Sequence, residues 1–266
     1  MAEKNRWTRE ETIIALYYYF QIPYGHLTKN NPQILQIAEI LGRTPSSVSM
    51  KMGNLARFDQ TLQKRGVHGL SNGSRMDDLI WHEFFNHYEK LIFSAETALN
   101  HLKEKHSDSL FTTTPSFCTP SNSYDHRNKE SPTSEKNRQA FFNHAVLASY
   151  DVKCCMTGIA IPELISVCHI KPVNACQNEE EKISPQNGLC MNALFKEAFR
   201  TGLISIRSDN MKIMVSPKLK NHKRLDPVTK SWIVASEGRE IIKPQHCVPE
   251  KNFLEYHNDV IFEHGS

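Results

Sequence analysis

The feature that most constrains the fold is an ordered pattern in the second half of the chain. An apolar run ends in His169-Ile170, Pro172 then breaks it, and Asn187-Gly188-Leu189 opens a second extended segment. Residues 190–200 follow with apolar side chains at helical spacing. The order strand, polar loop, strand and helix predicts a ββα unit in which the first strand carries a histidine near its end.

Changes in composition divide the chain into three regions. Residues 1–103 are rich in apolar positions at helical spacing, and the same periodicity returns in residues 137–266. Residues 104–136 are rich in Ser, Thr, Pro and Asn and contain few apolar side chains. Such a segment cannot offset the entropy of its own ordering, so it is predicted to be a flexible linker. The expected class is α+β, with a helical domain joined by the linker to a mixed domain that contains the ββα hairpin.

The first region predicts three or four helices. Thr8 and Glu11 have the spacing of a capping box, and a second helix is expected from about Pro32. In residues 41–48 a glycine stop precedes a threonine cap and Pro45, which together predict a third helix with a polar outer face. This order is a helix-turn-helix arrangement. One further helix face is predicted from the apolar residues Trp81, Phe84, Phe85, Tyr88 and Leu91.

Residues Trp7 to Phe58 resemble the Myb/SANT-like DNA-binding domains. The resemblance rests on Trp-Thr-x-Glu-Glu and on Ile-Ala-x-x-Leu-Gly-Arg-Thr-x-x-Ser-Val. It implies that the third helix enters the major groove. Two residues are then expected to contact phosphate, namely Arg43 and Lys51, and three to contact base edges, namely Ser47, Asn54 and Arg57. The alternative is a three-helix bundle that binds other proteins.

The C-terminal region predicts a helix from Arg138 to Tyr150, followed by a short strand and turn at residues 154–158. Residues 162–170 are expected to form the strand that carries His169. A polar loop is predicted for residues 174–185, and a helix for residues 190–200.

Residues 138–262 resemble the HNH, or ββα-metal, endonuclease family. The motifs are Tyr-Asp-x-x-Cys-x-x-Thr-Gly from Tyr150, His-Ile-x-Pro from His169, and Asn-Gly-Leu-Cys-x-Asn-Ala-Leu from Asn187. The resemblance implies phosphodiester hydrolysis in which His169 is the general base and Asn187 holds the loop and His169 in register. It also implies a single divalent metal, Mg²⁺ or Mn²⁺, that stabilises charge on the phosphate.

The positions at which this family binds its metal carry unsuitable residues. Phe195 stands where the family has a helix histidine, Arg200 where it has an aspartate, and Cys168 directly before the base histidine. Phenylalanine has no donor atom, arginine is a permanent cation, and a thiol is a soft ligand that does not match Mg²⁺. The sequence therefore predicts no confident metal ligand.

Three functions remain open on this basis. The first is a DNA-binding HNH endonuclease of restriction or defence type with a degenerate metal site. The second is an inactive pseudo-nuclease that binds DNA as a regulator or interaction protein, with Arg200 on a phosphate. The third is a domain without nucleic acid, in which His169 is a core residue.

Charge and composition set the expected partners. The formal net charge is +3 and the pI is near 8.4, which permits nucleic-acid binding without requiring it. A local basic run is a further candidate for backbone contact, although such runs are often only solvated; it contains Lys218, Lys220, Lys223 and Arg224. DNA is the expected partner, a homodimer is possible, and no membrane contact is expected. No apolar leader or membrane span is visible, so a cytoplasmic location with reduced cysteines is predicted.

Overall fold

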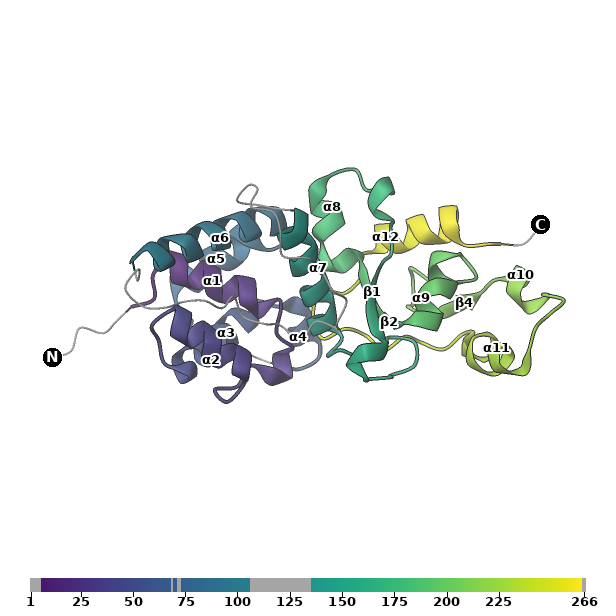
Figure 1. The fold of residues 1–266 in the computed structure, drawn as a ribbon, viewed down its shortest axis with the longest axis horizontal. Helices are drawn as coiled ribbons and strands as arrows, with labels where there is room; N and C mark the ends of the chain where they lie inside the picture. Colours follow the sequence, from purple (N-terminus) through teal and green to yellow (C-terminus); the bar gives the residue numbers. More distant parts are fainter. Residues whose placement is uncertain (1–5, 68, 71–72, 106–134, 265–266) are drawn as a thin grey trace. The chain divides into compact units, whose positions relative to one another are not determined.

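The computed structural model describes residues 6–67, 69–70, 73–105 and 135–264 (Figure 1). They form two compact units, Met1–Ser149 and Tyr150–Ser266, and combine helices with two small antiparallel sheets. The α+β class is therefore confirmed. Most of the expected linker, residues 106–134, lies outside the described residues. No helix in the described ranges has both the length and the apolar character needed to cross a membrane.

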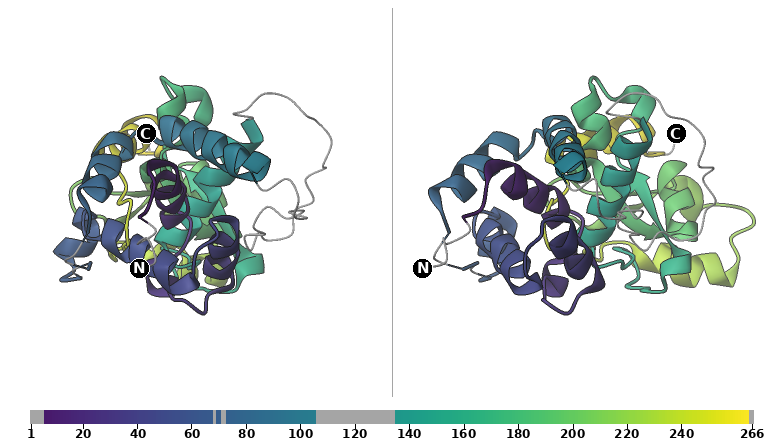
Figure 2. Two further views of the ribbon diagram at one scale, coloured as in Figure 1. Left: turned by 90° about the vertical axis from the view of Figure 1, so that its left-hand side faces the viewer. Right: turned by 60° about the vertical axis from the view of Figure 1, so that its left-hand side comes forward.

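The first unit is helical (purple to teal in Figures 1 and 2). Helix α1 packs against α3, α5 and α6, and α2 packs against α3. The helices of this unit are α1 (Arg9–Tyr19), α2 (Pro32–Ile40), α3 (Pro45–Ala56), α4 (Gln60–Lys64), α5 (Arg75–Phe84), α6 (Tyr88–Lys105) and α7 (Glu135–Ser149).

The helix starts predicted from capping residues are confirmed. The Thr8 hydroxyl accepts from the Glu11 amide while the Glu11 carboxylate accepts from the Thr8 amide, which completes the capping box of α1. Asn31 caps α2 ahead of Pro32. Thr44 caps α3 ahead of Pro45, and Gly42 turns the chain before it with a φ of +60°.

The apolar face predicted for residues 81–91 does not lie on one helix. Phe85 is extended, with ψ of 126°, and Asn86 has a φ of 63°, so the chain breaks between α5 and α6. The expectation of a single helix was wrong because side-chain periodicity continues across a sharp turn that only the backbone reveals. Of the residues on this face, Trp81, Phe84, Tyr88 and Leu91 are buried, and Phe85 is partly exposed.

Helix α7 follows the expected linker in sequence but packs within the first unit. Arg138 pairs with Glu89 of α6 at 2.9 Å, and the ring of Phe141 stacks on Tyr17 of α1 with centroids 5.5 Å apart. The boundary between the compact units accordingly falls after Ser149.

Buried charges hold α3 in place. The Lys51 ammonium lies 2.5 Å from the Asp77 carboxylate, and both side chains are nearly inaccessible, at 4% and 1% exposure. Arg43 makes two hydrogen bonds to Glu11, at 2.9 and 2.7 Å. Both cations also lie over the ring of Trp7. These pairs join α3, and the turn before it, to α1 and α5.

The second unit contains the predicted hairpin. Strands β1 (Ile165–His169) and β2 (Gly188–Asn192) pair antiparallel, with His169 opposite Gly188, and α9 (Ala193–Arg200) packs on both (Figure 1). The remaining elements are α8 (Glu179–Ile183), β3 (Ile204–Ile206), β4 (Ile213–Val215), α10 (Pro217–Lys220), α11 (Pro227–Trp232) and α12 (Lys251–Tyr256). Strands β3 and β4 form a second antiparallel pair.

Four local predictions for this unit are corrected. Residues 162–164 of the expected strand form a 3-10 turn, and Glu179–Ile183 of the expected polar loop form α8. Residues 154–158 form turns without a strand, because the Gly158 amide bonds back to the Cys154 carbonyl. The last helix of the hairpin begins at Ala193 rather than at Cys190. Asn192 accepts from the Phe195 amide at 3.0 Å and so caps the helix, while residues 190–192 complete β2.

The C-terminal end of α9 is fixed by a glycine and a histidine. Gly202, with φ of +71°, donates to the Phe199 carbonyl, and Leu203 donates to that of Ala198, which is a Schellman motif. A Cβ at Gly202 would lie 2.0 Å from the Ile261 carbonyl oxygen, so only glycine fits. His257 stacks on Phe199, donates from Nε2 to its carbonyl oxygen at 3.0 Å, and has its pKa lowered to about 4 by burial.

We predict that Lys51→Met destabilises the first unit by about 3 kcal/mol, because the Asp77 carboxylate is left buried without its cation. The double variant Lys51→Met/Asp77→Asn should recover part of this loss. Chemical denaturation followed by tryptophan fluorescence measures the free energy of unfolding. Lys64→Met, at an exposed position of α4, is the matched control, and equal stability of the two methionine variants would refute the prediction.

Candidate functional site

The hairpin places His169 at the last residue of β1, next to the polar segment that leads to β2. Its Nε2 lies 2.9 Å from the carbonyl oxygen of Lys182. A carbonyl can only accept, so Nε2 carries the proton and Nδ1 is the basic nitrogen of the neutral ring. Burial lowers the pKa of His169, the Lys182 carbonyl partly opposes this, and the positive charge of Lys196 lowers it further. The ring is therefore neutral at pH 7, as a general base must be.

Asn187 is fully buried and binds the backbone around Lys171. Its Oδ1 accepts from the Lys171 amide at 2.8 Å, and its Nδ2 donates to the Lys171 carbonyl at 3.1 Å and to the Glu181 carbonyl at 3.0 Å. The Ile170 amide in turn donates to the Asn187 carbonyl. The Asn187 side chain thus joins the start of the segment between β1 and β2, at Lys171, to its later part, at Glu181. This geometry is what the predicted role in loop registration requires.

A largely buried ion pair also holds this segment. The Lys171 ammonium lies 2.7 Å from the Glu181 carboxylate, and it also lies over the Tyr256 ring at 5.5 Å. Helix α8 is held by this pair, by Asn187 and by the His169 bond to Lys182. The residues predicted to carry chemistry are therefore brought together on a closed loop.

The positions expected to bind a metal do not fit a divalent cation. Phe195 is fully buried in the core, and burial raises the pKa of the Cys168 thiol to about 11, which keeps it protonated. The Asn192 oxygen already caps α9. Across the described residues, no group of three or more His, Cys, Asp or Glu side chains is arranged to hold a metal ion. The donor set lacks the clustered carboxylate and imidazole ligands that Mg²⁺ or Mn²⁺ requires.

Cations occupy this part of the site instead. Lys196 and Arg200 lie one turn apart on α9. Their positive charges partly oppose the burial that raises the pKa of Cys168, and Lys196 also lowers the pKa of His169. Arg200 is exposed and pairs with Glu197 at 2.6 Å. We call Lys196 and Arg200 the α9 cations. Sequence reasoning identified Arg200 but missed Lys196, whose i, i+4 spacing from Arg200 was the available signal.

The candidates in the first unit separate into two groups. Arg43 and Lys51, expected to contact phosphate, have their charges directed into the unit against Glu11 and Asp77. Both therefore act as structural cations, and neither is available to contact a DNA phosphate. Ser47 and Asn54 are partly exposed on α3. Arg57 lies over the Phe58 ring and packs against Gly73, where an added Cβ would be 2.7 Å from its Cζ.

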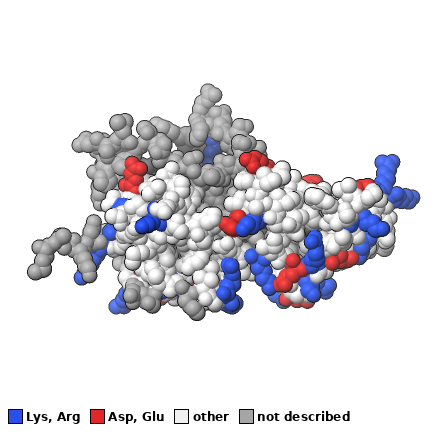
Figure 3. Space-filling view, turned by 90° about the horizontal axis from the view of Figure 1, so that it is seen from below, with Lys and Arg blue, Asp and Glu red and all other residues white. Residues whose placement is uncertain are grey.

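The basic run lies after β4, on and beyond α10. Lys218 pairs with Glu263 at 3.2 Å, and Lys220 pairs with Glu237 at 2.8 Å, whereas Lys223 and Arg224 are exposed on the turn that follows. On the face drawn in Figure 3, Lys and Arg side chains are interspersed with Asp and Glu. Local clusters, rather than the net charge of the chain, therefore decide where an anion can bind.

We predict that Asn187→Ala destabilises the second unit by about 3 kcal/mol, because the buried polar groups at Lys171 and Glu181 lose their partner. Amide hydrogen exchange should show lost protection at Lys171. Asn174→Ala, an exposed change in the same segment, should cost less than about 0.5 kcal/mol. Retained protection at Lys171 in the Asn187 variant would show that the side chain does not close the loop.

Comparison with known proteins agrees with this geometry. No curated protein was found to match the chain. Residues 154–207 match the model of the HNH endonuclease family, and the matched segment contains His169, Asn187, both strands of the hairpin and α9.

Proposed function

We propose that this protein is a DNA-binding pseudo-nuclease, whose HNH-type hairpin holds a backbone phosphate on protein cations instead of cleaving it with a metal. The observation that carries the proposal is the presence of cations where the family has metal ligands: Arg200 stands at the expected aspartate position, and Lys196, one turn earlier, acts on both Cys168 and His169. The match of residues 154–207 to HNH endonucleases supports DNA as the partner. The proposal does not require a homodimer.

The α9 cations suit a phosphodiester. Lys196 is half-buried, so its charge is less screened than that of a fully exposed lysine. The guanidinium of Arg200 can bind two phosphate oxygens at once. Its present partner, Glu197, forms an exposed and solvent-screened ion pair with it, so Arg200 can turn to a phosphate at little cost. Neutral His169 adds a polar group at the same place without repelling either cation.

The first unit extends the contact in this proposal. We propose that α2, the turn at Gly42 and α3 act as a helix-turn-helix, because Ser47 and Asn54 occupy partly exposed positions of α3. With Arg57, these residues remain the candidate base-edge contacts. Two weak DNA-binding units on one chain raise each other's effective concentration, so neither needs high affinity alone.

A second candidate function is an endonuclease of restriction or defence type. It is favoured by the intact pair of His169 and Asn187, since the base is neutral and its loop is closed. The chemical difficulty is the transition-state charge, which a divalent cation stabilises by several kcal/mol in such enzymes. The residues at the ligand positions offer nothing equivalent to clustered carboxylates.

Duplex binding tests the proposed phosphate site. We expect the full chain to bind labelled duplex DNA in fluorescence anisotropy, with affinity that falls steeply as salt rises. Lys196→Gln should weaken binding roughly tenfold, the loss of one charge-assisted contact, and reduce the slope of log affinity against log salt by about 1. Lys251→Gln on α12 removes an exposed lysine of the same unit and is the control. Identical titrations for the two variants would exclude Lys196 from the interface.

A plasmid assay separates the two candidate functions. We expect no nicking of supercoiled plasmid in Mg²⁺ or Mn²⁺ beyond the level seen with a chelator or with His169→Ala. Metal-dependent nicking by the unchanged protein that disappears in His169→Ala would establish the endonuclease and reject the pseudo-nuclease.

A further inference from the structure

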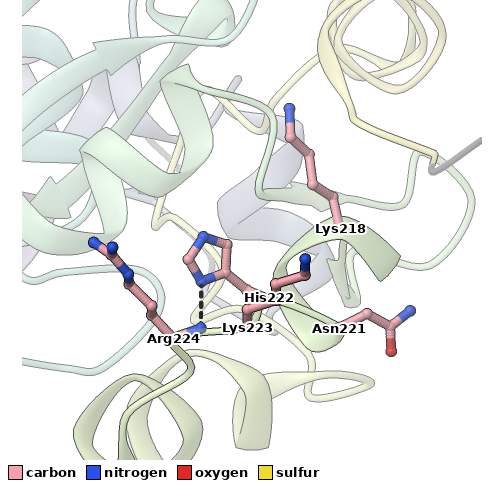
Figure 4. Close-up of a pocket in the computed structure, with 5 residues that line it drawn as sticks. All are labelled: Lys218, Asn221, His222, Lys223 and Arg224. Carbon is pink, nitrogen blue, oxygen red and sulfur yellow. Dashed lines mark hydrogen bonds between the residues drawn. The ribbon is translucent and has the colours of Figure 1, made fainter.

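A basic pocket lies apart from the hairpin, in the turn that follows α10. It has a volume of about 450 Å³ and is lined by Lys218, Asn221, His222, Lys223 and Arg224 (Figure 4). All five residues are exposed, and they come from one short stretch of chain. This stretch is anchored to the core of the unit. Leu219 is buried, and the buried hydroxyl of Ser216 caps α10 by accepting from the Lys218 amide at 3.1 Å.

The lining of the pocket has only one sign of charge. It includes two lysines and one arginine, and no carboxylate. Lys218 forms an ion pair with Glu263 at 3.2 Å, and both side chains are about half exposed. Lys223 and Arg224 pair with no carboxylate among the described residues, in contrast to Lys220, which is held by Glu237 outside the lining. The pocket therefore carries uncompensated positive charge.

His222 adds an oriented donor. Its Nδ1 accepts from the backbone amide of Arg224 at 3.2 Å, which is the dashed line in Figure 4. The neutral ring consequently carries its proton on Nε2, and the figure shows this nitrogen on the side of the ring away from that bond. Cations together with an N–H donor match the oxygens of a phosphate, which accept hydrogen bonds and carry charge.

We propose that this pocket binds a second backbone phosphate of the same DNA. The inference rests on the proposed function, because it takes its ligand from the DNA that the α9 cations hold. Exposed cations on a short anchored turn suit an extended polyanion, since each contact releases condensed counterions without needing an enclosed cavity. The pocket would position the duplex and contribute no base specificity.

The experiment compares two charge-matched double variants of the full chain by anisotropy with labelled duplex DNA over a range of salt. Lys223→Gln/Arg224→Gln removes the unpaired cations of the pocket. Lys243→Gln/Arg207→Gln removes the same charge from exposed residues that already pair with Glu240 and Asp209. The pocket variant should lose at least about tenfold in affinity and lower the salt slope by about 2, while the control changes little.

The charge-preserving exchange Lys223→Arg/Arg224→Lys should retain the salt slope. That result would attribute the weaker binding of the glutamine variant to lost charge rather than to lost folding. Equal titrations for the pocket variant and its control, with Lys196→Gln still weakened, would overturn the pocket inference alone. Absence of duplex binding by the unchanged protein would overturn the proposed function and the inference together. Calorimetry with inorganic phosphate tests whether the pocket binds free phosphate instead. If the unchanged protein binds phosphate saturably and the pocket variant does not, while duplex binding is the same in both, the pocket binds free phosphate and the DNA contact is rejected.

Discussion

The buried amide of Asn187 is the interaction on which the hairpin site depends. It satisfies the amide and the carbonyl of Lys171 simultaneously, and these groups have no access to water that could replace it. The polar segment between β1 and β2 is thereby closed at the residue where the first strand ends. His169 then meets a carbonyl from the same closed segment, which selects its tautomer. The orientation of the histidine follows from the loop, and the loop follows from one side chain.

The lysines and arginines of the two units fall into two groups. Some stabilise the fold, and others are available to a ligand. In the first unit, Lys51 and Arg43 form ion pairs with carboxylates inside the structure. In the second unit, Lys223 and Arg224 are exposed, Lys196 is partly exposed, and Arg200 pairs with Glu197 at the surface. A basic residue in a sequence motif is therefore a poor guide to binding until its internal partners are known.

Much of this architecture could be predicted from sequence, for reasons that are local. Capping residues such as Thr8 and Thr44 act within three residues of themselves, so their helices are visible in the chain, as is the strand ending in His169. What failed depended on distant partners or on backbone angles. The burial of Lys51 needs Asp77 of another helix, the break at Asn86 needs a positive φ, and the role of Lys196 needs the end of β1 to lie beside α9.

The packing of Phe195 has a consequence for any metal site at this position of α9. Its ring is fully enclosed in the core of the second unit, where removal of a phenylalanine side chain costs about 3–5 kcal/mol. That is a large share of the roughly 5–15 kcal/mol that stabilises a typical domain. Placing a histidine at this position would sacrifice packing before any ligand set was complete, since Cys168 and Arg200 would also have to change. In this hairpin, core packing and metal ligation therefore compete for one side-chain position, and the ring of Phe195 gives that position to the core.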